Sequence, residues 1–587
     1  MSEQISPRKK MKSEVEKLSV VEMENQSVTE SVMDSDAMNR FSRQNAALGA
    51  ETTAKLIKMK VLIVGMRGVG VEAAKNLSLQ GAGAITIFDD KPAEISDVGL
   101  NFFISEADVR AGLTRAAIIA PKLKELNSLC VITVAEALSE EIALSHSALV
   151  ITDRSFPMKD LLYWNNFCRR RGIPFFYSFL AGVSCSLFSD LGPAHVINDP
   201  TGSRPMQKII SNISAVDETT CLIHYETPEG QPSISLSEGT YEVSDVKGLP
   251  RINGKVFEVT HPPSDPVKTV RVKFSLDSAD VYVSGGQLLE KKIPKEYPME
   301  SLEVKLRSPG SPFADPPTTV LTDLINFGGE TQQHVAFYAC LEFVSRQGRF
   351  PGLYNDEDAA MVRELADELL ESRAIDLECF EIDSEFFKTY SYLSSVEIQP
   401  MVAFVGGVLA QEVVKCTGKF TPIPGFMHFS AREVLPSETP VDVMPRGSMY
   451  DNLAAVFGWD FIEKLKGLQY FMVGCGALGC EFMKNFALNG VCCGPQGKLV
   501  VTDADRIELS NLSRQFLFRE HNVGQPKSRA AAAMAKVMNP AFNVEALELF
   551  VGANTEDSFN DDFWMNLSGV CNALDNMVMV FTFFFVG

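Results

Sequence analysis

The chain has 587 residues, 45% of them hydrophobic, so we expect several domains with large buried cores. Its formal net charge of −21 argues against a nucleic-acid partner and is compatible with a basic protein partner. The sequence shows no signal-peptide pattern and no apolar stretch of about 20 residues that could span a bilayer, so we expect no membrane partner. The 12 cysteines lack a paired CxxC zinc spacing, which favours a reducing, intracellular compartment.

The N-terminal region is polar and charged, so residues 1–38 are predicted to be a disordered tail. The basic cluster SPRKKMK at 6–12 is either a nuclear-import signal or an ordinary basic tail, and we expect a cytoplasmic and nuclear location. A helical segment containing Arg43 then leads into an apolar strand at 60–64. The pattern at 161–182 predicts a helix followed by another strand of the same sheet.

The middle of the chain changes character twice. Residues 205–300 are short alternating runs broken by Gly and Pro, which predicts a small β-barrel-like insertion. From Glu330 onward, apolar residues recur at three- and four-residue spacing, which predicts a helical bundle. A further helix is expected at 399–415, with two glycines that would permit close helix packing, and residues 432–447 are interpreted as a linker.

The stretch 469–575 carries the clearest chemical signal. An apolar strand runs directly into the glycine loop formed by Gly474, Gly476 and Gly479, and a helical pattern follows. Such a loop lets backbone N–H groups approach phosphate oxygens, and the helix N-terminus adds partial positive charge. A second strand ends at Asp503, which is placed like the acidic residue that binds a ribose hydroxyl.

Further polar side chains follow the ribose position and a third apolar strand: Asp505, Asn511, Arg514, Gln515, Lys527 and Asp575. Two cations and two additional carboxylates suit a nucleoside triphosphate with Mg²⁺ better than a nicotinamide cofactor. Taken singly, Arg514 and Lys527 could equally be solvated surface residues. Their combination after a glycine loop favours the nucleotide interpretation.

Residues 61–153 repeat this stretch. VGMRGVGVEAAKNLSLQG (64–81) matches VGCGALGCEFMKNFALNG (473–490), and FDDKPAEISDVGLNFFI (88–104) matches TDADRIELSNLSRQFLF (502–518). In this register, the counterparts of Gly476, Asp505, Asn511, Arg514 and Lys527 are Arg67, Lys91, Asp97, Leu100 and Leu113, while Asp89 and Asp153 keep carboxylates. The sequence therefore predicts an intact copy at 469–575 and a degenerate copy at 61–153, packed as a pseudo-dimer within one monomer.

These residues resemble a known family. GCGALGCEF, DADRIELSNLSRQFLF, the Lys527 segment with its downstream MNP, and NALDN resemble the active adenylation half of ubiquitin-activating enzymes. The degenerate copy resembles their inactive half, and the whole is more distantly similar to bacterial ThiF-like adenylating enzymes. The resemblance implies an α/β fold in which two ThiF/Rossmann-like repeats, one inactive and one active, form a pseudo-dimer with a small β-barrel insertion and a helical-bundle insertion.

The resemblance also implies a domain plan. It comprises a disordered tail (1–38), the first part of the inactive repeat (39–204), the barrel insertion or first catalytic-cysteine half-domain (205–300), a linker with the helical bundle (301–395), the return to the inactive repeat (396–440), the incomplete active repeat (441–576) and an aberrant apolar tail (577–587). Cys221 in the barrel insertion is not expected to be the thioester cysteine.

The implied activity is ATP-dependent adenylation of the C-terminal glycine of ubiquitin, with release of pyrophosphate. The resemblance assigns phosphate contacts to Arg514, Lys527 and Arg43, with Arg43 reaching across the pseudo-dimer. Gly474, Gly476 and Gly479 would form the nucleotide loop, Asp503 would bind the ribose, and Asn511 and Gln515 would give polar support. Asp575 and Asp505 would hold Mg²⁺.

The sequence departs from the family after Asn576. The resemblance implies a following domain with the catalytic cysteine and a ubiquitin-fold domain that recruits ubiquitin-conjugating enzymes, whereas here MVMVFTFFFVG (577–587) follows. None of the cysteines lies in a Pro-x-Cys-Thr-type context, so we expect a truncated product without the thioester step. Three alternatives stay open: an activator of another ubiquitin-like modifier, a non-catalytic fragment that binds ubiquitin, and an NAD-dependent oxidoreductase, which the two cations and Asp575 disfavour.

Overall fold

The computed structural model describes residues 35–227, 236–259, 268–277, 280–322, 328–377 and 380–574. Most of the predicted N-terminal tail, the basic cluster at 6–12, Asp575 and the apolar tail at 577–587 lie outside the described residues. The chain divides into two compact units. The smaller unit comprises Ala194–Tyr297 and Gly418–Thr421, and the rest of the chain belongs to the larger unit.

The larger unit contains a seven-stranded sheet with the order β15-β6-β5-β4-β1-β2-β3. Its strands are β1 (Lys60–Val64), β2 (Ala84–Phe88), β3 (Val131–Val134), β4 (Ala148–Ile151), β5 (Phe175–Ala181), β6 (Ser184–Asp190) and β15 (Gly425–Ser430). Strands β1 to β5 are parallel, and β6 and β15 are antiparallel to their neighbours. Every residue of β4, β5 and β6 is buried, as expected for apolar strands covered on both faces.

A second, fully parallel sheet of the larger unit has the order β18-β17-β16-β19. Its strands are β16 (Gln469–Val473), β17 (Lys498–Thr502), β18 (Val544–Leu547) and β19 (Gly569–Asn572). This order reproduces β3-β2-β1-β4 of the first sheet, strand for strand. The prediction of two Rossmann-like repeats is therefore confirmed.

The N-terminal third of the larger unit has many short helices. They are α2 (Ser35–Arg40), α3 (Ser42–Leu48), α4 (Ala50–Lys58), α5 (Gly68–Leu79), α6 (Ile95–Val98), α7 (Glu106–Arg110), α8 (Arg115–Lys124), α9 (Glu140–Leu144) and α10 (Met158–Arg171). The remaining helices are α11 (Leu302–Arg307), α12 (Gly329–Gln347), α13 (Asp356–Glu371), α14 (Ser384–Leu393), α15 (Gln399–Lys415), η2 (Arg432–Val434), α16 (Asp451–Phe457), α17 (Trp459–Lys466), α18 (Ala477–Asn489), η3 (Leu509–Ser513), η4 (Glu520–Asn522), α19 (Lys527–Met538), η5 (Ala553–Thr555) and α20 (Asp561–Met565). In the described part of the chain, no helix has the length and apolar character needed to cross a membrane.

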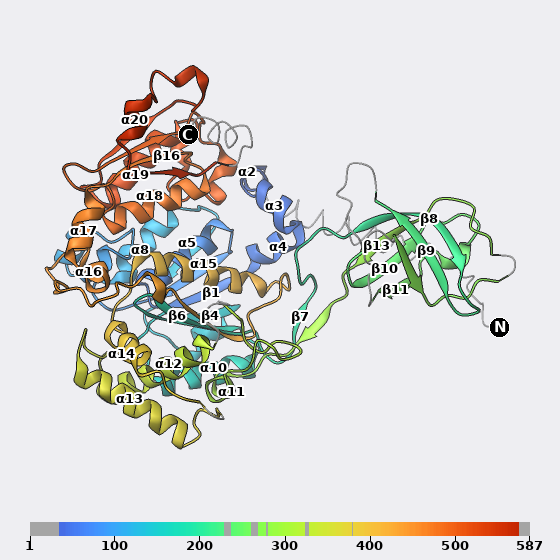
Figure 1. The fold of residues 1–587 in the computed structure, drawn as a ribbon, viewed down its shortest axis with the longest axis horizontal. Helices are drawn as coiled ribbons and strands as arrows, with labels where there is room; N and C mark the ends of the chain where they lie inside the picture. The colour runs from blue at the N-terminus through green and yellow to red at the C-terminus, as the bar shows by residue number, and fades with distance from the viewer. Residues whose placement is uncertain are drawn as a thin grey trace. The chain divides into compact units, whose positions relative to one another are not determined.

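Helix α15 packs between the two repeats, against α5 and α18 (Figure 1). A Cβ added to Gly406 would lie 2.3 Å from the Cβ of Glu72 on α5, so this contact requires a glycine. A Cβ added to Gly407 would meet nothing within 4 Å. The predicted close approach therefore depends on Gly406, and the same expectation for Gly407 was wrong because that glycine faces away from α5.

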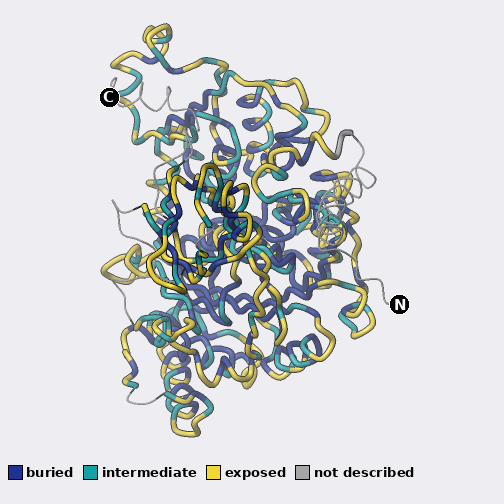
Figure 2. Tube along the Cα trace, turned by 90° about the vertical axis from the view of Figure 1, so that its right-hand side faces the viewer, coloured by how far each residue is buried: buried dark blue, intermediate teal, exposed yellow. Residues whose placement is uncertain are grey.

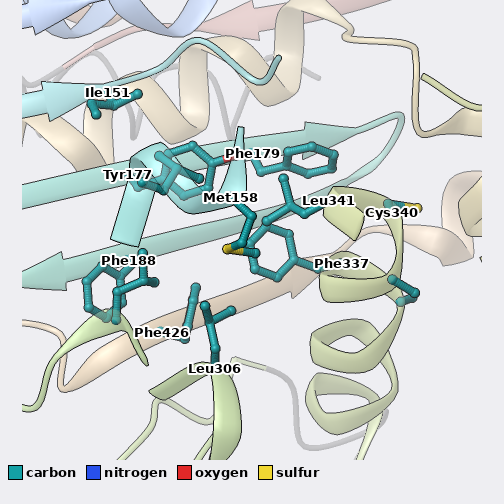
Figure 3. Packing of buried hydrophobic residues seen from close by; sticks show 14 of the residues in the cluster. Ile151, Met158, Tyr177, Phe179, Phe188, Leu306, Phe337, Cys340, Leu341 and Phe426 are labelled. Carbon is teal, nitrogen blue, oxygen red and sulfur yellow. The ribbon is translucent and has the colours of Figure 1, made fainter. Parts of the chain in front are cut away.

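Helices α12, α13 and α14 form the predicted bundle beside the seven-stranded sheet. Figure 3 shows Phe337 of α12 facing Phe426 and Met158, and the ring centroids of Phe337 and Phe426 are 5.6 Å apart. Fully burying each such side chain stabilises the fold by about 1.5–3 kcal/mol. Figure 2 shows buried residues throughout the interior of the larger unit and exposed residues along its peripheral loops.

The smaller unit is the predicted barrel-like insertion. Its strands are β7 (His195–Ile197), β8 (Gln207–Ala215), β9 (Cys221–Glu226), β10 (Gly239–Ser244), β11 (Val256–Val259), β12 (Thr269–Val272), β13 (Gln287–Lys291) and β14 (Lys295–Tyr297), with η1 (Pro250–Ile252). Six of them form an antiparallel sheet, β11-β10-β13-β8-β9-β12, whose edge strands β11 and β12 contact each other and nearly close a barrel. Burial raises the pKa of the Cys221 thiol to about 11, so this cysteine is a poor nucleophile at neutral pH.

Candidate functional site

The glycine loop of the intact copy joins β16 to α18. Gly474 has φ +100°, and a Cβ there would lie 2.5 Å from the carbonyl oxygen of Ala573. A Cβ on Gly479 would lie 2.2 Å from the carbonyl oxygen of Gly474. Gly476 differs, because a Cβ there would meet nothing within 4 Å. Two glycines are thus needed for backbone packing, and the third faces open space at the start of α18.

The N-terminus of α18 has the features of an anion site. Gly476 is its N-cap residue, and no side chain caps the helix. The first backbone N–H groups of a helix lack intrahelical partners, and the helix dipole places partial positive charge beside them. The open face of Gly476 therefore leaves room for a phosphate next to these donors.

Asp503, at the end of β17, lies against the glycine loop. Its carboxylate accepts hydrogen bonds from the backbone N–H of Cys475 at 2.6 Å and of Asp505 at 2.8 Å. Burial raises the pKa of Asp503, although these backbone donors oppose the rise. The carboxylate fixes the loop to the sheet and still has acceptor capacity for a hydroxyl group.

The structure brings Asp505 and Lys527 together as an ion pair, with Nζ 2.8 Å from Oδ2. The backbone N–H of Lys527, the first residue of α19, also donates to the carbonyl oxygen of Asp505 at 3.0 Å. The Asp505 side chain is 64% exposed, so its carboxylate remains open to a ligand. In the described part of the chain, no cluster of three or more His, Cys, Asp and Glu residues could hold a metal, and Asp575 lies outside that part.

Segment η3 and the two residues that follow it carry the other predicted site residues. The side-chain oxygen of Asn511 accepts from the backbone N–H of Glu508 at 3.0 Å, so Asn511 shapes the turn. Arg514 is exposed, and its Nη1 donates to the carbonyl oxygen of Ser510 at 2.9 Å. Gln515 is only 3% exposed, and its Oε1 has no hydrogen-bond partner among the described residues.

Arg43 is an exposed residue of α3, and both α2 and α3 contact η3 of the other repeat. The degenerate side shows the matching contact in atomic detail. There, Asn452, the counterpart of Arg43, donates from Nδ2 to the carbonyl oxygen of Ser96 at 3.1 Å. Ser96 is the counterpart of Ser510 in η3. The segment that precedes each repeat, which we call its leading segment (35–48 for the first repeat and 449–457 for the second), therefore contacts the site of the other repeat.

The two leading segments are also held in place by equivalent aromatic contacts. A Cβ on Gly81 would lie 2.7 Å from the ring of Phe41, and a Cβ on Gly490 would lie 2.8 Å from the ring of Tyr450. Phe41 and Tyr450 are counterparts, and both are buried. The two leading segments are therefore anchored in the same way before they cross.

The degenerate copy fills its own site. Arg67 occupies the position of Gly476, and its guanidinium contacts Asp97 at 2.8 Å and Glu397 at 3.0 Å. Arg115 also contacts Asp97 at 2.7 Å, and Lys91 contacts Asp153 at 2.6 Å. The cavity at this place has a volume of about 160 Å³, and its charges are already paired within the protein.

Strand register revises one sequence match. Val64 of β1 pairs with Ile151, whereas Val473 of β16 pairs with Asn572. By this register the counterpart of Asp153 is Leu574, one residue before Asp575. The two aspartates are thus offset by one position relative to the strand register.

Sequence reasoning missed an ionic cluster between the repeats, formed by Glu72 and Lys75 of α5 with Glu481 and Lys484 of α18. Glu72, Lys75 and Lys484 are buried, and the Glu481 side chain is 36% exposed. Lys75 lies 2.9 Å from Glu72 and 2.5 Å from Glu481, and Lys484 contacts both glutamates. Two counterpart rings, Phe102 and Phe516, lie beside the two lysines. The signal was the Glu-x-x-Lys-Asn sequence shared by both copies, which by itself is indistinguishable from a surface ion pair.

Comparison with known proteins agrees with this architecture. The model of the ThiF family matches residues 41–439 and 450–581. Ubiquitin-activating enzyme E1 1 of Arabidopsis thaliana is 39% identical over 549 residues, which cover 91% of this chain and 48% of that protein. Ubiquitin-like modifier-activating enzyme 1 of Homo sapiens is 36% identical over 550 residues, which cover 92% of this chain and 50% of that protein.

The chain spans about half the length of the curated relatives it matches. Among solved structures, E. coli MccB with succinimide matches at 21% sequence identity and a TM-score of 0.23. That match covers 25% of this chain and 47% of the MccB chain.

Proposed function

The chain belongs to the ThiF family, and on that premise we propose that it activates ubiquitin by ATP-dependent adenylation of the ubiquitin C-terminus. The observation that carries this proposal is the contrast between the two copies. The intact copy keeps open space at Gly476 beside an ion pair that a ligand can reach, whereas the degenerate copy fills the same space with Arg67. The name of the similar Arabidopsis protein, a ubiquitin-activating enzyme, supports ubiquitin as the substrate.

In the proposed reaction, a carboxylate oxygen of ubiquitin attacks the α-phosphorus of ATP, and the bond to pyrophosphate breaks. The carboxylate is already a nucleophile, so no general base is needed. The protein contributes alignment and stabilisation of the phosphate charge. The α18 N-terminus with Gly476 receives phosphate oxygens, Asp503 receives the ribose, and Gln515 gives polar support through its unpartnered Oε1.

The cations of the site come from both repeats. Arg514 and Lys527 come from the intact copy itself, and Arg43 comes from the leading segment of the other repeat. Asp505 would hold Mg²⁺ through its exposed carboxylate, because Mg²⁺ in nucleotide sites takes one or two carboxylates plus phosphate oxygens. Asp575, which the resemblance assigns to the same ion, lies outside the described residues. When bound, Mg²⁺ neutralises charge on the leaving pyrophosphate. Before ATP binds, Asp505 and Lys527 pair with each other, with Nζ 2.8 Å from Oδ2.

The proposed product of this chain is the ubiquitin acyl-adenylate, without a following thioester step. Among the cysteines that the structure describes, none is exposed, and burial raises the pKa of Cys475 well above its usual range. These thiols do not fit the nucleophile of a thioester step.

The test is ubiquitin-dependent exchange between ATP and radiolabelled pyrophosphate, measured on the 587-residue chain. Lys527→Ala should lose the exchange, and Lys91→Ala, in the degenerate copy, should keep it. Exchange that depends on a different ubiquitin-like protein would identify another modifier as the substrate. Ubiquitin binding without exchange would support a non-catalytic fragment and refute the proposed adenylation.

A further inference from the structure

Arg40, the last residue of α2, connects the two repeats directly. Its side chain is buried, with an exposed fraction of 2% for the residue. Nη1 donates to Oε1 of Glu520 in the intact copy at 3.2 Å, and Nη2 donates to the carbonyl oxygen of Leu126 in the degenerate copy at 2.6 Å. One guanidinium therefore binds both repeats at the place where the leading segment crosses between them.

Glu520 is held from two sides. Besides Arg40, the hydroxyl of Ser128 in the degenerate copy donates to the same Oε1 at 2.8 Å. The adjacent Arg519 is buried, and its Nε lies 3.9 Å from Glu125. The contact with Arg40 is thus part of the interface between the degenerate copy and the intact copy. Glu520 lies in this interface, six residues after Arg514 in the chain.

The residues around Arg43 are anchored, while Arg43 itself is exposed. Phe41 is buried against Gly81, and Gln44 donates from Nε2 to the carbonyl oxygen of Gln80 at 2.8 Å. Both anchors belong to the degenerate copy. Arg40 supplies the anchor on the intact side, and a six-residue helix such as α2 has little stability of its own.

The counterpart of Arg40 before the second repeat is Met449, which carries no charge. A Cβ on Gly99 would lie 2.0 Å from the carbonyl oxygen of Met449, so the backbone of that segment packs directly against Gly99 of the degenerate copy. The segment leading to the degenerate site therefore has no charged clamp and delivers no cation. The clamp therefore occurs in the segment that carries an arginine three residues later, Arg43.

We infer that Arg40 is a positioning residue, which clamps α2 to both repeats and thereby holds Arg43 against the nucleotide site of the intact copy. This inference rests on the proposed function for its effect on activity. The clamp itself is independent of that function. Without Arg40, α2 still packs against η3 but loses its side-chain link to Glu520. The remaining side-chain anchors of this segment, Phe41 and Gln44, bind the degenerate copy, so Arg43 is held less firmly against η3.

The decisive variant is Arg40→Met, which installs the residue found at the counterpart position. It should reduce ubiquitin-dependent pyrophosphate exchange by on the order of 10-fold and raise the KM for ATP, because catalysis by alignment is sensitive to small displacements. The KM for ubiquitin should stay unchanged. Arg110→Met removes an exposed surface ion pair and serves as the control, with exchange unchanged.

Two further measurements separate positioning from a general structural defect. In an Arg43→Ala background, Arg40→Met should reduce exchange less than about twofold, because the residue it positions is already gone. Hydrogen–deuterium exchange should become faster at 42–48 and 509–513 in Arg40→Met. Equal loss of activity in both backgrounds would overturn the inference, as would unchanged hydrogen exchange at these segments. If the wild-type chain shows no pyrophosphate exchange, the proposed function fails. Hydrogen–deuterium exchange at 42–48 and 509–513 would still show whether Arg40 holds α2 and α3 in place.

Discussion

Replacing Lys484 by methionine tests the ionic cluster between the repeats. Lys484 has an exposed fraction of 0% and lies 2.7 Å from Glu481, and it also contacts Glu72, whose exposed fraction is 1%. Two glutamates and two lysines make the cluster neutral, so Lys484→Met leaves buried Glu72 and partly exposed Glu481 to share Lys75 as their one remaining cation in the cluster. Breaking a buried ion pair in this way costs about 3–5 kcal/mol.

The double variant Lys484→Met/Glu72→Gln should cost less than the single variant, by about 1–3 kcal/mol, because it restores neutrality. Lys498→Met, which removes an exposed pair with Glu545, should cost less than about 1 kcal/mol. Hydrogen exchange of α5 and α18 at increasing urea concentration reports the opening free energy of this interface separately from the barrel unit. A single variant no more costly than Lys498→Met would refute the reasoning, as would a double variant that costs the sum of its parts.

The cluster also predicts a response to acid. Burial opposes ionisation of Glu481, but Lys484 and Lys75 outweigh it and lower the pKa of Glu481 to about 2. A carboxyl with a depressed folded pKa stabilises the fold above its unfolded pKa of about 4.3 and loses that contribution as pH falls. The interface should therefore weaken between pH of about 4.5 and 2. In Lys484→Met the loss should begin at a higher pH, and an unchanged acid midpoint in fluorescence-monitored titration would contradict this.

Three further experiments, with five substitutions, test the two copies and their interface. Gly476→Arg introduces the residue of the degenerate copy into the open space of the intact loop, so calorimetry should show loss of ATP binding; retained binding would contradict the loop's assignment. Asp575→Ala should abolish Mg²⁺-dependent pyrophosphate exchange and Asp153→Ala should leave it unchanged, whereas equal loss would contradict the assignment of intact and degenerate copies. Gly406→Ala should destabilise the fold by about 1–3 kcal/mol through overpacking, and Gly407→Ala should stabilise it by about 0.5–1 kcal/mol as a helix-interior replacement. The opposite order in urea unfolding would show that α15 does not depend on close packing at Gly406.

Much of the architecture could be predicted because its signals are local. The two glycine loops follow apolar strands, and the repeat of this pattern predicted two Rossmann-like sheets, which their identical strand order confirms. The alternating pattern of the insertion predicted the antiparallel barrel, and the helical spacing from Glu330 predicted α12 to α14. The roles of Arg514, Lys527 and Arg43 toward a nucleotide stay predictions, although the structure places the segment that carries Arg43 against η3.

Other features depend on contacts between distant segments and had no local signal. Glu72 and Lys75 match Glu481 and Lys484 in sequence, yet only the packing of α5 against α18 turns two ordinary helical pairs into one ionic cluster. Gly406 and Gly407 are adjacent in sequence, and the orientation of α15 alone decides which of them must remain glycine.

The sequence predicts one copy with residues suited to a nucleotide and one copy that lacks them, because that difference lies in residue identity at fixed spacing from a glycine loop. The contacts by which the two copies depend on each other have no such local signal and are visible only in the folded chain. Arg40 bridges Glu520 and Leu126, and Arg67 is neutralised by Asp97 and Glu397, through contacts between residues 30 to 480 positions apart in the chain. Such pairings are set by the packing of whole elements, since burial and charge compensation are properties of the assembled interior and not of a sequence window.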